Sequence, residues 1–66
     1  MSDMELAIEI INLKIAKVAK ENTNKNYSEF NKKINLLKEE KKKIYLNDRK
    51  IIDKVIKTYG NDVKTN

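Results

Sequence analysis

The chain lacks cysteine, histidine and proline, and it contains a single glycine. Without cysteine it forms no disulfide, and without cysteine and histidine it lacks the commonest zinc ligands. One glycine cannot build the glycine-rich loops that bind phosphates or dinucleotides. Helical glutamates such as Glu5 and Glu9 form no pattern specific for catalysis. We therefore expect a protein that is not an enzyme and holds no cofactor or metal.

Long apolar runs are also missing, since no run exceeds three residues. A membrane-spanning helix needs about 20 apolar residues. The chain opens with Asp3, Glu5 and Glu9 before any basic residue, whereas secretory leaders open with positive charge. These features predict a cytoplasmic protein with no membrane partner.

The short length limits the core that the chain can build. A chain of 66 residues forms one domain at most, and such a domain buries only about 60% of the surface of its unfolded form. Small domains without disulfides or metals commonly gain stability by associating with another chain. This size therefore favours an oligomer.

The residues that are present indicate helices, because 38% are charged, 39% are hydrophobic and none is proline. Ser2 and Glu5 have the spacing of a capping box, which predicts a helix over residues 3–21. Residues 22–26 are Asn-Thr-Asn-Lys-Asn, which favours a loop. No glycine or proline interrupts residues 27–59, which predicts a long second helix. The expected fold is all-α, a helical hairpin of a short and a long helix that assembles into an oligomeric helical bundle.

The end of the domain is predicted at residue 60. Gly60 is suited to the left-handed position that follows a helix, so residues 1–60 form one helical domain and residues 61–66 a flexible polar tail. An alternative is a break near residue 47, with Asn47 or Asp48 capping a third helix. That alternative gives a three-helix bundle.

Two apolar faces on the first helix carry the oligomer hypothesis. One stripe alternates four- and three-residue spacings, as in a coiled-coil seam, and consists of Met4, Ile8, Ile11, Ile15 and Val18. A second stripe, formed by Leu6, Ile10 and Leu13, points about 150° away. A single neighbouring helix cannot cover both stripes. Either a third helix of the same chain or a second subunit must cover the other one.

Two polar residues, Lys41 and Asp48, interrupt the apolar seam of the long helix. If two copies of that helix packed antiparallel about residues 44 and 45, Lys41 of one copy would face Asp48 of the other. The alternatives are that both side chains reach solvent or that Asp48 caps a helix. The predicted oligomer interface consists of Leu6, Ile10, Leu13, Leu37, Lys41, Ile44, Tyr45, Asp48 and Ile52.

The net charge of the chain is +5, and it is unevenly distributed. Residues 1–13 contain three acids and no base, so residues 14–66 carry a net charge of +8. Such a surface can attract anions, although glutamates interrupt it and one arginine offers little bidentate recognition. The possible anion-binding residues are Lys32, Lys33, Lys38, Lys42, Lys43, Arg49 and Lys50.

The leading hypothesis for function is a non-catalytic interaction protein. Lysine, asparagine and isoleucine are abundant and have A/T-rich codons, which suggests an AT-rich genome such as that of a low-GC bacterium, its phage or a mobile element. A small accessory factor that binds itself and inhibits or sequesters a host protein fits the size and the composition. The alternative is a protein that binds nucleic acid or an anionic nucleotide through its lysines.

Overall fold

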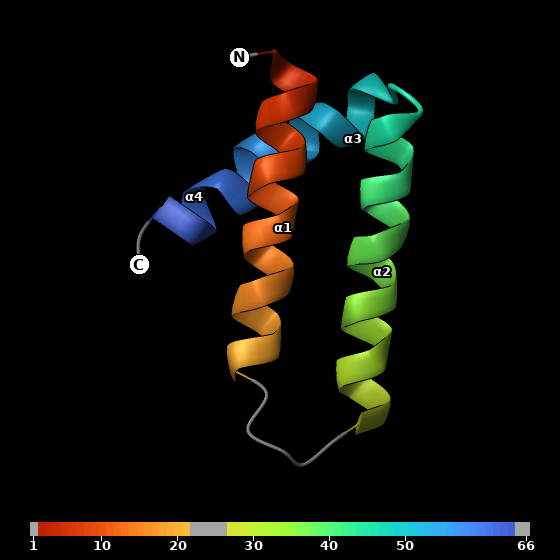
Figure 1. The fold of residues 1–66 in the computed structure, drawn as a ribbon, viewed down its shortest axis with the longest axis vertical. Helices are drawn as coiled ribbons and strands as arrows, with labels where there is room; N and C mark the ends of the chain where they lie inside the picture. Colours follow the sequence, from red (N-terminus) through yellow and green to blue (C-terminus); the bar gives the residue numbers. More distant parts are fainter. Residues whose placement is uncertain (1, 22–26, 65–66) are drawn as a thin grey trace.

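The computed structural model describes residues 2–21 and 27–64, and these residues form helices and turns without any strand. Helix α1 spans Asp3–Glu21 and helix α2 spans Tyr27–Tyr45. A third helical run follows, made of α3 (Arg49–Lys54), a π-helical turn η1 (Val55–Tyr59) and α4 (Gly60–Lys64). Figure 1 shows α1 and α2 side by side and antiparallel, with the third run starting beside the end of α2 and crossing behind α1. None of the described helices is long and apolar enough to cross a lipid bilayer.

The start of α1 confirms the capping box. The backbone N–H of Glu5 donates to Ser2 Oγ at 3.1 Å, and the backbone N–H of Ser2 donates to Glu5 Oε1 at 3.2 Å. These two bonds satisfy donors that the first turn of a helix leaves without a partner. The helix covers the predicted residues, whereas the predicted loop 22–26 lies outside the described residues.

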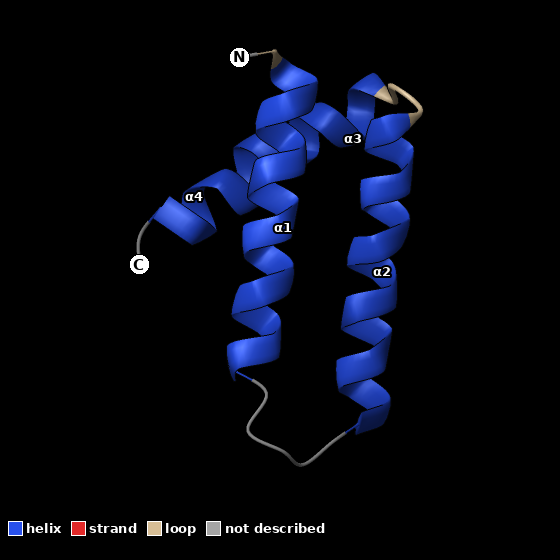
Figure 2. Cartoon of the chain, viewed as in Figure 1, coloured by secondary structure: helices blue, strands red, loops and turns tan. Residues whose placement is uncertain are grey.

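The prediction of one helix over residues 27–59 is wrong, because the chain turns between Tyr45 and Arg49. Asn47 adopts a φ of 63°, a left-handed conformation that asparagine tolerates better than most residues. Asp48 then caps α3, since its Oδ1 accepts from the backbone N–H groups of Lys50 at 3.1 Å and Ile51 at 3.4 Å. Figure 2 shows this turn as a short loop between helices. The break near residue 47 gives three helical stretches.

Gly60 also differs from its predicted role. Its φ of −57° and ψ of −44° are helical, so Gly60 begins α4 and takes no left-handed conformation. A Cβ atom built on Gly60 would lie 3.4 Å from Ile10 Cδ1, so the backbone here packs closely on α1. Part of the predicted tail is therefore helical through Lys64, and residues 65–66 lie outside the described residues.

The core lies where the third run crosses α1 and α2. Its buried apolar residues come from all three stretches and are Ala7, Ile10, Ile11, Leu37, Ile44, Ile52 and Val55. The third run contacts α1 through α3, η1 and α4, but it contacts α2 mainly through α3. As Figure 1 shows, it covers only the half of the helix pair that lies near the α2–α3 turn. Within residues 2–21 and 27–64, the opposite half of the pair has two helices and no third layer.

The second apolar stripe of α1 is covered mostly by the chain itself. Ile10 is buried beneath Gly60, and Leu6 is half-buried against the core. The third helix, which the long-helix prediction omitted, occupies that face, so Ile10 is not exposed for contact with another subunit. Leu13, the last member of the stripe, remains 51% exposed.

Candidate protein interface: a groove between α1 and α2

A groove of about 420 Å³ opens between α1 and α2 in the half of the molecule that the third run leaves uncovered. Its apolar lining consists of Val18, Phe30, Leu36, Leu37 and Tyr59. Its charged lining consists of Lys14, Glu21, Glu29 and Lys33. Leu36 is 57% exposed although it lines the groove, so the apolar surface is accessible from solvent.

Tyr59 closes one end of the groove, because its side chain extends from η1 towards α2. Its hydroxyl donates a 2.7 Å hydrogen bond to Glu40 Oε1, and Lys54 Nζ lies 2.5 Å from the other carboxylate oxygen. Glu40 is 3% exposed and is the one charged residue that is buried among the described residues. A buried carboxylate requires such partners, since an unpaired charge in the interior is strongly destabilising. The three residues therefore fix η1 against α2.

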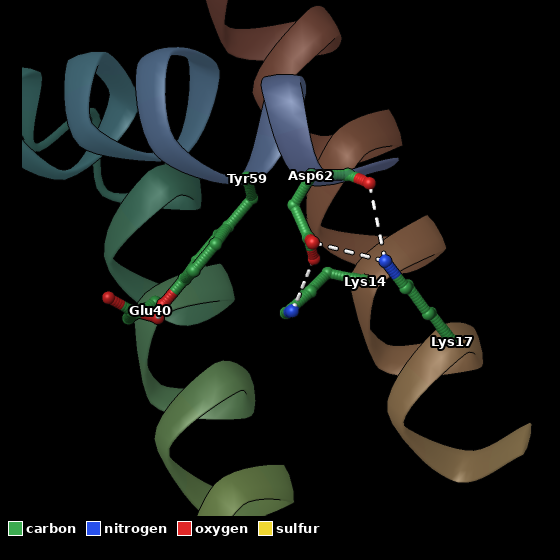
Figure 3. Close-up of polar contacts among 5 residues, drawn as sticks. All are labelled: Lys14, Lys17, Glu40, Tyr59 and Asp62. Atoms are coloured by element: carbon green, nitrogen blue, oxygen red, sulfur yellow. Dashed lines mark hydrogen bonds and ion pairs between the residues drawn. The ribbon is translucent and has the colours of Figure 1, made fainter. Parts of the chain in front are cut away.

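Asp62 makes the matching attachment of α4 to α1. Its carboxylate accepts from Lys14 Nζ at 2.5 Å and from Lys17 Nζ at 3.0 Å, and its backbone carbonyl accepts from Lys17 Nζ at 3.3 Å. Figure 3 shows Tyr59 and Asp62 pointing to opposite sides, one to α2 and the other to α1. The ammonium of Lys14 also lies 5.8 Å from the centre of the Tyr59 ring, within the range of a cation–π interaction.

These contacts shift the pKa values of the groups involved. Hydrogen bonds from Lys14 and Lys17 hold the pKa of Asp62 below its ordinary value. Burial raises the pKa of Tyr59, and the hydrogen bond to the Glu40 carboxylate adds to that increase. The same carboxylate raises the pKa of Lys54. The contacts therefore favour the protonated forms of Tyr59 and Lys54 and the ionised form of Asp62.

A second hollow, of about 490 Å³, lies between α1 and α4. Its lining residues are Leu13, Ala16, Lys17, Lys20, Glu21 and Val63. Glu21 lines both the groove and this second hollow, so the two depressions adjoin along the last turns of α1. Leu36 lines the groove and Leu13 lines the second hollow, and both are more than half exposed.

The structure does not bring the predicted interface residues together on one surface. Leu37, Ile44 and Ile52 are buried in the core of the chain, so their assignment to contacts between subunits is wrong in this fold. They were expected outside because the long-helix prediction left the far half of that helix without a partner, whereas that half turns after Tyr45 and packs back on α1 and α2 as the third run. Tyr45 is exposed, at 59%, and lies beside the α2–α3 turn.

The proposed Lys41–Asp48 pair between two copies is also wrong for this fold. That register requires a continuous helix through residue 48, and α2 ends at Tyr45. Asp48 instead uses its carboxylate to cap α3. Lys41 is half-buried on α2, and the seam position between Leu37 and Ile44 is filled by the buried Glu40.

The predicted anion-binding residues are all exposed, namely Lys32, Lys33, Lys38, Lys42, Lys43, Arg49 and Lys50. They do not act as one cluster, since Lys33 lines the groove and Arg49 is engaged by acids. The guanidinium of Arg49 lies 2.5 Å from Asp3 and 3.1 Å from Asp53. Its hydrogen bond with Asp3 raises the pKa of Arg49. No described group of three or more acidic side chains is arranged to hold a metal ion.

Sequence reasoning missed the residues that shape the groove. Glu40 follows Leu37 by three positions and precedes Ile44 by four, so helical spacing could have placed it on the buried face. No local signal identifies the contacts of Asp62 with α1, because Lys17 and Lys14 lie 45 and 48 positions earlier in the chain. No family model, curated protein or solved structure matches this chain.

Proposed function

We propose that this chain is an interaction protein that binds a helical or leucine-containing segment of another protein in the groove between α1 and α2. The observation that carries the proposal is the groove's accessible apolar lining beside an incomplete third layer. An amphipathic helix placed there would continue the layer that the third run begins. Binding of an apolar helix face between two helices is a recurring mode of recognition.

The charges around the groove support a protein ligand. Two acids and two lysines line it, so its lining has no net charge although the chain carries +5. Lys14 is paired with Asp62, and Glu21 lies at the end of α1 near the second hollow. A mixed rim around an apolar floor resembles the general organisation of protein interfaces. An accessory factor that occupies a host protein's surface would need only such a groove and no catalytic group.

Titration with a designed peptide tests the proposal. The probe is an amphipathic helical peptide of about 14 residues with leucines at positions i, i+3, i+4 and i+7. We expect it to shift the backbone amide resonances of Val18, Phe30 and Leu37 in the labelled full-length chain. A control peptide with serine in place of each leucine should cause no such shifts. Absence of shifts at the groove with the leucine peptide contradicts the proposal.

A variant at the rim sharpens this test. Leu36→Ser alters an exposed side chain, so the fold should tolerate it, and it removes apolar surface from the groove. Burying one leucine stabilises a complex by about 1.5 to 3 kcal/mol, so the affinity for the leucine peptide should fall about tenfold or more. Leu13→Ser is the matched control, because Leu13 is similarly exposed but lines only the second hollow.

A second candidate function, binding of nucleic acid or another polyanion, is favoured by the orientation of Glu40. That acid interrupts the basic run of α2 in the sequence, but its side chain is buried, which leaves Glu39 as the exposed acid between Lys38 and Lys43. Binding to a labelled oligonucleotide should weaken steeply with added salt if this surface contacts phosphates. Binding that is absent at low salt would exclude this second function.

A further inference from the structure

One face of helix α2 carries lysines and tyrosines but no acidic residue. Residues that follow one another in alternating steps of four and three lie on the same side of a helix. Such steps lead from Tyr27 to Tyr45, about five helical turns and a rise of about 27 Å. We term this surface the lysine–tyrosine face, and its members are Tyr27, Asn31, Ile34, Lys38, Lys41, Lys42 and Tyr45.

The three acids of α2 lie away from the lysine–tyrosine face. Glu40 is buried against the third run, Glu29 lines the groove, and Glu39 projects about 100° away from Lys38. No ion pair joins the lysines of this face to another described residue, whereas the lysines near the closed end of the groove are paired with acids. The positive charge of this face is therefore available to an anion from outside the chain.

Exposed aromatic rings stand at both ends of this face. Tyr27 is 71% exposed and Tyr45 is 59% exposed, whereas the third tyrosine of the chain, Tyr59, is half-buried and donates to Glu40. The hydroxyls of Tyr27 and Tyr45 make no hydrogen bond to any described residue. A face that served solubility alone would need the lysines but not the two rings. Rings on which bases stack, beside cations that contact phosphates, are how many proteins bind single strands.

We infer that the lysine–tyrosine face binds single-stranded nucleic acid, whose phosphates contact the three lysines and whose bases stack on Tyr27 and Tyr45. This inference rests on the second candidate function, because it names the class of polyanion and the face of α2 that binds it. The argument from stacking requires unpaired bases, since the bases of a duplex are already stacked on one another.

The composition of the face disfavours the two other polyanionic partners. It contains no arginine to make the bidentate guanine contacts by which proteins read the major groove of a duplex. It also offers no leucine, phenylalanine or tryptophan to insert into an anionic membrane, and Ile34 is half-buried.

Strands with and without bases test the inference. Fluorescence anisotropy measures binding of the full chain, at low salt, to a labelled oligothymidylate of about 12 nucleotides and to an abasic strand of the same length. Both strands carry the same phosphates, so only the first can stack. We expect the oligothymidylate to bind about tenfold or more tightly than the abasic strand and more tightly than a duplex of equal length.

Variants at exposed positions locate the contact. Tyr45→Ala should weaken binding of the oligothymidylate about tenfold but leave binding of the abasic strand within about twofold, whereas Tyr45→Phe keeps the ring and should bind both strands as the wild type does. Lys42→Gln should weaken binding of both strands and reduce the slope of log affinity against log salt by about 0.7. Lys57→Gln is the matched control, because it makes the same charge change at an exposed site of η1 and should leave the slope unchanged. Circular dichroism confirms that each variant stays folded.

The outcomes separate this inference from the proposals on which it rests. Equal affinity for the two strands, or tighter binding of the duplex, overturns the inference and leaves the second candidate function standing. Absence of binding to strands and duplex at low salt overturns the inference and excludes nucleic-acid binding as well. Binding to phosphatidylserine vesicles without binding to the oligothymidylate also overturns it. The groove proposal survives each of these results, since no residue of the lysine–tyrosine face lines the groove.

Discussion

Tyr59 donates a 2.7 Å hydrogen bond to Glu40, which joins the π-helical turn η1 to helix α2 across the closed end of the groove. Lys54 binds the other oxygen of the same carboxylate, so one buried acid organises two residues of the third run. Asp62 holds the next turn against Lys14 and Lys17 of α1. The position of the groove wall therefore depends on polar contacts as well as on the apolar core.

Replacing Glu40 should destabilise the fold. Glu40→Ala removes the acceptor for the Tyr59 hydroxyl and the counterion of Lys54, and we expect the free energy of unfolding to fall by about 2 kcal/mol. Lys54 is nearly half exposed and regains water, which keeps the loss below that of a fully buried pair. Urea unfolding followed by circular dichroism measures the change. Glu39→Ala alters an exposed neighbour and should change stability by less than about 0.5 kcal/mol.

The attachment at Asp62 predicts a dependence on acid. Its pKa is lower in the folded chain than in the unfolded chain, so the folded state binds the proton less readily. The resulting stabilisation is complete above about pH 4 and is lost as pH falls through the depressed pKa. Asp62→Asn should therefore lower the urea midpoint at neutral pH, and the difference from wild type should shrink below about pH 4. A difference that stays constant with pH contradicts this account.

Two substitutions at Asp48 distinguish a helix cap from an ion pair. Asparagine caps helices as well as aspartate does, so Asp48→Asn should leave stability nearly unchanged. Asp48→Ala removes the acceptor for the N–H groups of Lys50 and Ile51 and should cost about 1 kcal/mol. Thermal unfolding measures both values. If Asp48 stabilised the fold through its negative charge rather than as a hydrogen-bond acceptor, the two variants would be equally destabilised.

Gly60→Ala tests the helical conformation at the start of α4. Glycine is less favourable than alanine within a helix by about 0.8 to 1 kcal/mol, and the added Cβ meets Ile10 Cδ1 at 3.4 Å, which is ordinary contact. We expect the variant to be more stable by about 0.5 kcal/mol. A left-handed Gly60 would give the opposite sign, so a loss of stability in thermal unfolding would contradict the helical φ.

Local signals predicted the first helix and failed at the junctions. The capping box of Ser2 and Glu5 acts within one turn, and the sequence therefore specified the start of α1 correctly. The second helix was extended across Asn47 because propensity over residues 27–59 is favourable, whereas a left-handed asparagine and a capping aspartate end it. The alternative prediction, a helix break near residue 47, rests on these same two residues, Asn47 and Asp48.

Tertiary contacts explain the remaining errors. Gly60 has the residue type of a helix terminus, but its lack of a side chain instead allows close packing on Ile10. Glu40 belongs to a highly charged run, and only the arrival of Tyr59 and Lys54 from the third run permits its burial. The apolar groove could not be predicted as a site, since it exists only because the third run covers one half of the helix pair.

The incomplete third layer divides the molecule into two parts that should fluctuate differently. Where the third run crosses, an amide can exchange its hydrogen with solvent only when the whole core opens. In the last turns of α1 and the first turns of α2 fewer packed side chains resist fraying, so exchange there should be faster and should proceed through small local openings. Any segment that docks between those turns would slow that exchange. Binding by this protein would then be coupled to a loss of local fluctuation at the least protected end of the helix pair.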